Sequence, residues 1–132
     1  MRKFKFAVAA VLVAIGVASA AAFASTKGTV SLRTTQAGRV LVGAGGRTLY
    51  LFTADKGTKS VCYGQCAAYW PPLIAQTPTV GAGLSASLLG TTKRKDGKLQ
   101  VTYGGHPLYT FHGDTSTKIL CNGVDGWYVV KA

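Results

Sequence analysis

The sequence predicts an all-β protein with one or two short helical inserts, in which antiparallel hairpins from an internal two-fold repeat pack as one compact sandwich- or barrel-like domain. Residues 45–66 and 104–125 carry the repeat, because they are identical at ten of 22 positions when aligned at an offset of 59. Short apolar runs separated by Gly-rich turns surround both copies, and this pattern is typical of β-hairpins. Two copies are too few for a solenoid, so we expect the two units to pack against each other.

Hairpins and single strands are predicted over most of the repeat-bearing part of the chain. Apolar segments interrupted by turns predict three hairpins, over residues 38–52, 91–103 and 98–111. The second of these turns at Asp96-Gly97, which is the strongest type of short turn signal. Two further runs are predicted as single strands, 29–35 and 126–130.

Two short segments are predicted to be helical. Residues 65–70 can form a helix up to Pro71-Pro72, and residues 84–90 can form one that ends at Gly90. A connector rich in Gly, Thr and Pro divides the predicted β domain, residues 25–132, into two similar units, about 38–74 and 90–130.

The first residues predict export. A basic head precedes an uncharged Ala/Val-rich stretch that ends in small residues, which is the pattern of a secretory signal peptide. We expect a signal peptide over residues 1–24, and a secreted, periplasmic or cell-envelope protein with no transmembrane span after its removal. An uncleaved anchor over residues 6–24 is the alternative, since that stretch approaches the ~20 residues needed to cross a bilayer. No cysteine precedes Cys62, so we expect no lipid attachment at this end.

The charge balance favours anionic partners. Without the three basic residues of the predicted signal peptide, twelve Lys and Arg stand against four Asp and no Glu, a net charge of +8. Such a surface attracts cell-envelope polymers or acidic lipid headgroups. The densest group, Lys93-Arg94-Lys95 with Lys98, flanks the Asp96-Gly97 turn and is interpreted as a solvated hairpin tip. It lacks interleaved aromatic residues, so we expect no nucleic acid.

The repeated aromatic motif is interpreted as structural. It consists of two aromatic residues and an aspartate in each copy: Tyr50, Phe52 and Asp55, then Tyr109, Phe111 and Asp114. The two aromatic residues of a copy share one face of a strand, which predicts a shared core; a ring shelf for a sugar is the alternative. Each aspartate follows its strand, where a carboxylate can accept backbone N–H bonds from the next turn.

No catalytic, metal or cofactor site is predicted. His112, beside Gly113-Asp114, is the candidate functional residue, because His106 occupies a turn. No Ser-His-Asp or Cys-His arrangement and no phosphate-binding loop can be nominated.

Three cysteines in an exported protein predict one disulfide and one remaining thiol. Cys62 and Cys66 form the local candidate pair. Cys121, which is equivalent to Cys62 in the repeat, is the alternative partner and would join the two units.

The paired motifs "YLFTAD" and "YTFHGD" resemble a predicted bacterial lipoprotein family defined by a Y-x-(F/W/Y)-x-x-D motif and also described as a secreted repeat of unknown function. The resemblance covers residues 38–130, including "WPPL" and "LLGTTKRKDGKLQVTYGGHPLY". It implies an exported protein of two similar β units without an established enzymatic activity. The lipoprotein label does not carry over, because the attachment cysteine is missing.

These observations predict a non-enzymatic extracytoplasmic binding or envelope-associated module. The alternative is a redox- or metal-handling protein that uses its cysteines and His112.

Overall fold

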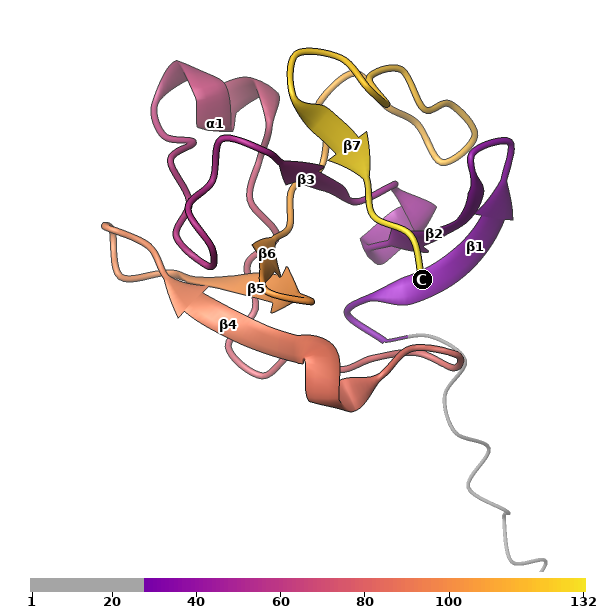
Figure 1. Cartoon of the computed structure of the whole chain (residues 1–132), viewed down its shortest axis with the longest axis horizontal. Coiled ribbons are helices and arrows are strands. Elements are labelled where there is room, and N and C mark those ends of the chain that lie inside the picture. The colour runs from indigo at the N-terminus through magenta and orange to yellow at the C-terminus, as the bar shows by residue number, and fades with distance from the viewer. Residues whose placement is uncertain (1–27) are drawn as a thin grey trace, which may run out of the picture.

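The computed structural model describes residues 28–132 (Figure 1). The predicted signal peptide, residues 1–24, lies outside the described residues. Seven strands with a few helical turns form three small sheets, and every pairing between named strands is antiparallel. The all-β class is therefore confirmed, and in the described part of the chain the sheets do not close into a barrel.

Each unit begins with a hairpin. In the first unit β1 (Ser31–Thr35) pairs with β2 (Gly38–Val42), and in the second β4 (Leu89–Lys93) pairs with β5 (Leu99–Tyr103). β5 then turns back into β6 (His106–Pro107) through Gly104 and Gly105. Both glycines have a positive φ, 59° and 83°, which a two-residue hairpin turn of this kind requires. The predicted hairpins over 91–103 and 98–111 are thus present.

A central strand joins the two units. β3 (Tyr50–Phe52) pairs on one side with β7 (Trp127–Val129), and on its other side Tyr50 forms an isolated bridge to Tyr109. In that bridge the Tyr50 N–H donates to the Tyr109 carbonyl at 2.8 Å, and the Tyr109 N–H donates to the Tyr50 carbonyl at 3.0 Å. Figure 1 shows β3 in the middle of the molecule, with β7 and β6 on either side. The two copies of the motif therefore meet at one point.

The second copy of the motif does not form the strand predicted up to residue 111. Residues 108–111 are extended, but only Tyr109 forms bridges, to Tyr50 and to Pro72. A regular ladder cannot continue beside Pro71-Pro72, since proline has no N–H to donate.

One helix prediction is confirmed and the other is wrong. α1 (Gln65–Tyr69) occupies the predicted segment before Pro71-Pro72. Within residues 84–90 only Ala86–Leu88 forms a single 3-10 turn. Leu89 and Gly90 already belong to β4, where pairing with β5 outweighs the local helical preference.

The core has two parts, one on each face of β3. Tyr50 and Phe52 face the first, and Leu49 and Leu51 face the second, as strand alternation predicts. The first part is aromatic and includes both tryptophans, whereas the second is mainly aliphatic. Both parts draw residues from both units, so each unit completes the core of the other.

Candidate functional site

Each unit supplies a carboxylate to the tyrosine of the other unit. The Tyr50 hydroxyl donates to Asp114 Oδ2 at 2.5 Å, and the Tyr109 hydroxyl donates to Asp55 Oδ2 at 2.7 Å. In both cases the other carboxylate oxygen accepts the backbone N–H of the residue six positions further on. The repeated aspartates therefore fix their own loops and bind the opposite unit at the same time.

Burial controls the protonation of these groups. Desolvation and the neighbouring carboxylate raise the pKa of Tyr50 and of Tyr109 well above the ordinary value of 10.0. Desolvation also raises the pKa of Asp55, although the Val61 N–H and the Tyr109 hydroxyl oppose this shift. Both tyrosines consequently stay protonated at neutral pH and act as hydrogen-bond donors.

The two aspartates and His112 do not form a shared site. Asp55 and Asp114 bind different tyrosines, whereas His112 is exposed and packs its ring edge-on against Tyr69 and Phe111, with centroids 4.9 and 4.8 Å apart. Within residues 28–132 no three His, Cys, Asp or Glu side chains lie close enough to hold one metal ion. The arrangement offers neither an acid–base pair nor a set of metal ligands.

Two tryptophans stack between the units. The rings of Trp70 and Trp127 are parallel within 2°, with centroids 3.8 Å apart. Phe52 also stacks on Trp127 at 4.1 Å, and Phe111 packs against Trp70 at 4.6 Å. The faces of the motif aromatics are thus covered by one another rather than open to a sugar.

The sequence comparison at a constant offset missed this pair. Pro72 lies opposite Tyr109 as Val129 lies opposite Tyr50, so the chain there repeats at an offset of 57 rather than 59. The five residues of α1 correspond to a turn that is two residues shorter. A comparison that allowed this gap would have aligned Trp70 with Trp127.

The cysteines follow the local pairing. Cys62 and Cys66 form a disulfide, while Cys121 is free and packs, partly buried, against the aromatic part of the core. Burial, together with the charges of Asp114 and Asp125, raises the pKa of the Cys121 thiol. A thiol with a raised pKa is a weak nucleophile at neutral pH. Its reactivity is therefore low.

Arg94 corrects the interpretation of its segment as a solvated hairpin tip. Its side chain is only 5% exposed, and its guanidinium donates to Ser60 Oγ at 3.0 Å, Gln100 Oε1 at 2.7 Å and the Cys62 carbonyl at 2.7 Å. The guanidinium also lies over the Tyr63 ring, 4.2 Å from its centroid. These acceptors are absent from the local sequence and come from a segment more than 30 residues away. Arg94 thereby fastens the β4–β5 hairpin to the loop of residues 53–62.

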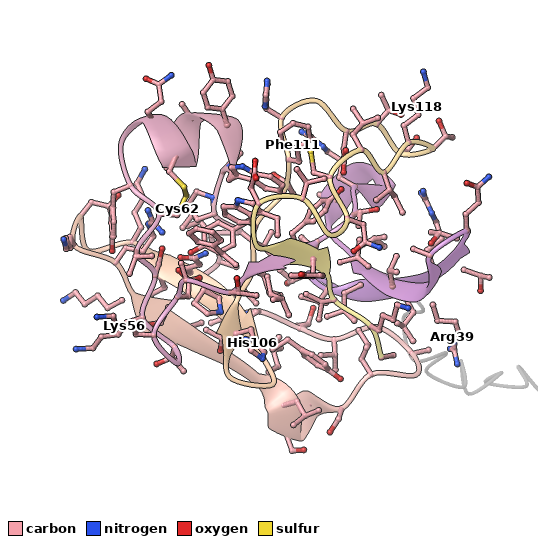
Figure 2. The ribbon with its side chains drawn as sticks, turned by 45° about the horizontal axis from the view of Figure 1, so that its top comes forward. Arg39, Lys56, Cys62, His106, Phe111 and Lys118 are labelled. Carbon is pink, nitrogen blue, oxygen red and sulfur yellow. A yellow bond between two sulfur atoms is a disulfide. The ribbon has the colours of Figure 1, made fainter. Side chains whose placement is uncertain are left out.

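Exposed lysines gather where Arg94 joins these two segments. Lys56 and Lys59 exchange both backbone hydrogen bonds across a tight turn, and residues directly opposite in such a pair extend their side chains to the same side. We define the basic cluster as the five exposed lysines of the two segments, Lys56, Lys59, Lys93, Lys95 and Lys98. In Figure 2, Lys56 lies on the side of the hairpin tip, and Lys118 and Arg39 lie at the opposite side of the molecule.

Little negative charge opposes this cluster. Asp55 adjoins Lys56 in sequence, but its carboxylate accepts the inward bonds from Val61 and Tyr109. Asp96 is exposed at the hairpin turn, and its Oδ1 accepts the backbone N–H of Lys98. Five lysines thus stand against one exposed aspartate.

The family and membrane comparisons complete the description. In the described part of the chain, no helix is both long and apolar enough to cross a membrane. The model of a family described as a secreted repeat of unknown function matches residues 31–74 and again residues 90–131. The match to the first repeat includes β1, seven residues before the unit expected from the sequence. No curated protein and no solved structure matches the chain.

Proposed function

The chain belongs to the family of secreted repeats of unknown function, and from this premise we propose that it is a non-enzymatic extracytoplasmic module that binds anionic polymers of the cell envelope. The observation that carries the proposal is the basic cluster. It combines two loops that are distant in sequence, and buried Arg94 holds them in fixed relation.

The kind of cation in the cluster favours a flexible polyanion. Its exposed charges are all lysine ammonium groups, which act as mobile point charges, whereas the arginine that could grip a single phosphate or carboxylate with two bonds is turned inward. Several weak contacts along one chain add through their high effective concentration. A polymer with regularly spaced negative charges meets this requirement.

The surroundings of the cluster favour a polymer over a lipid surface. Proteins that lie on membranes insert exposed aromatic and aliphatic side chains beside their basic residues. Here the nearby Tyr63 ring is covered by Arg94 at 4.2 Å and by Lys95 at 4.9 Å. Binding to lipid headgroups is therefore the weaker of the two anionic interactions, and the experiment below includes it.

The test is binding of the chain, without residues 1–24, to polyphosphate and to polygalacturonate at increasing salt. We expect affinity to fall steeply with ionic strength, because exposed charges are screened. The variant Lys93→Gln/Lys98→Gln is expected to lose about tenfold or more in affinity, since each basic residue near an anionic surface contributes roughly 1 kcal/mol.

The matched control removes the same charge elsewhere. Arg39→Gln/Lys131→Gln changes two exposed cations outside the basic cluster and is expected to retain most of the affinity. Equal losses in the two variants would reduce the interaction to net charge and contradict the proposed site. Tighter binding to phosphatidylglycerol vesicles than to both polymers would contradict the polymer assignment.

A further inference from the structure

A polar hollow with a volume of about 660 Å³ lies between the turn of the β1–β2 hairpin and the loop that follows Asp114. Its size falls in the range of small-molecule sites, roughly 300–1,000 Å³. Guanidinium, amide and hydroxyl groups line it together with two apolar side chains: Arg33, Gln36, Ser116, Asn122, Ala37 and Ile119. No carboxylate lines the hollow, so a cationic ligand finds no partner there.

The corresponding place in the other half of the repeat is filled by the protein itself. There Arg94 enters between the β4–β5 hairpin and the loop of residues 56–62, and reaches Ser60. Thr35 is the counterpart of Arg94, since each is the last paired residue before the turn of its hairpin. Ile119 stands 59 residues after Ser60 and replaces its hydroxyl with an apolar group. A short side chain and a lost acceptor thus leave open, in one unit, the space that a guanidinium fills in the other.

The wall of the hollow holds donors in fixed positions. Asn122 Oδ1 accepts the Val129 N–H at 3.1 Å, which sets the orientation of the amide. Arg33 Nη1 donates to the Gly46 carbonyl at 3.0 Å, leaving its other N–H groups for a ligand. A Cβ at Gly46 would lie 2.8 Å from Arg33 Nη1 and 3.7 Å from Ser116 Cβ. The absent side chain therefore allows the guanidinium to lie against the loop.

We propose that this hollow binds a saccharide unit that carries a carboxylate. Ala37 and Ile119 offer an apolar surface to the C–H face of a sugar ring, and the surrounding hydroxyl and amide groups match its hydroxyls. Arg33 supplies the charge-assisted donors that a carboxylate prefers. The site is separate from the basic cluster: Lys118, within the loop that borders the hollow, lies on the opposite side of the molecule from Lys56 (Figure 2).

The inference goes beyond the proposed function, because it assigns a discrete saccharide site rather than a diffuse polyanion surface. The two fail independently. Lys93→Gln/Lys98→Gln removes charge from the basic cluster and is expected to leave saccharide binding at the hollow unchanged.

The experiment is a titration of ¹⁵N-labelled chain, without residues 1–24, followed by amide chemical shifts. The probes are methyl β-D-glucuronide, the neutral methyl β-D-glucoside, and acetate as a carboxylate without a ring. We expect the glucuronide to shift the amides of Gln36, Ser116 and Asn122, the glucoside to bind there more weakly, and acetate to cause no comparable shift.

Two variants test the residues involved. Arg33→Met is expected to reduce the glucuronide affinity about tenfold or more, to the level of the glucoside, because it removes a charged hydrogen bond. Gln36→Leu, at an exposed turn position, keeps the test valid if loss of the Arg33 bond to Gly46 prevents folding, and it is expected to weaken both saccharides. Shifts centred on the lysine loops, equal binding of glucuronide and glucoside, an equal response to acetate, or no response in the hollow would each overturn the proposal.

Discussion

Tyr50 and Tyr109 exchange both of their backbone hydrogen bonds at the centre of the molecule, and each donates its hydroxyl to the aspartate of the other unit. One pair of equivalent residues thus joins the two units through main chain and side chain together. The repeated Tyr-x-Phe-x-x-Asp segment is intelligible on this basis, since the tyrosine of one copy is satisfied only when the aspartate of the other is present. Retention of both copies follows from their mutual dependence.

Removing either tyrosine hydroxyl is expected to destabilise the protein. Tyr50→Phe leaves the 6%-exposed Asp114 without a side-chain donor, and loss of a hydrogen bond to a buried charged group costs about 2–3 kcal/mol. Tyr109→Phe is expected to cost less, because Asp55 is more exposed than Asp114. Urea unfolding measures both free energies.

The control for this pair is Tyr128→Phe. Tyr128 is 46% exposed, and surface substitutions usually change stability by less than about 0.5 kcal/mol. A Tyr50→Phe variant as stable as this control would show that the Tyr50–Asp114 bond contributes nothing.

Alkaline pH is expected to weaken the fold through the same tyrosines. Their folded-state pKa is raised above the ordinary 10.0, so above pH 10 the unfolded chain loses protons that the folded chain keeps. The free energy of unfolding therefore falls as pH rises past 10. Urea unfolding at about pH 9 and pH 11 tests this difference. Tyr50→Phe and Tyr109→Phe should each flatten the pH dependence, and an unchanged slope in both variants would contradict the assignment.

Arg94 is expected to be the stabilising basic residue of its segment. Arg94→Met leaves the Cys62 carbonyl and Gln100 Oε1 without their donor, and unsatisfied buried acceptors cost about 1–3 kcal/mol each. We expect a loss of about 2–4 kcal/mol in chemical unfolding. Lys95→Met is the matched control, since Lys95 is an exposed neighbour. If both substitutions had the same small effect, the buried network would have no energetic role.

The hairpins were predictable because their signals are local. The Asp96-Gly97 turn, the Gly104-Gly105 turn and the alternation of Leu49 with Tyr50 each depend on adjacent residues only. The helix predicted over 84–90 was wrong for the opposite reason. Leu89 is committed to β4 by Tyr103, which lies 14 residues away.

The candidate sites were less predictable, since distant segments create them. Nothing around Arg94 indicates that Ser60 and Cys62 will receive its guanidinium, so a charge run that is typically solvated was interpreted as exposed. The stacking of Trp70 on Trp127 was hidden by a two-residue difference in loop length. The hollow beside Thr35 becomes recognisable only when the two units are compared in space.

The cysteines give a last prediction, in which two kinds of measurement must agree. The Cys62–Cys66 bond closes a loop with a sequence separation of 4, and chain entropy assigns about 2 kcal/mol to a loop this short. Cys62→Ser/Cys66→Ser is expected to lose that amount in urea unfolding. Cys121→Ser breaks no crosslink, and its partly buried thiol limits the expected loss to about 1 kcal/mol. Thiol titration of unfolded, unreduced protein should find a single thiol, which reacts slowly in the folded state because its pKa is raised. Absence of a titratable thiol would mean that Cys121 is paired, and the local disulfide would then be contradicted.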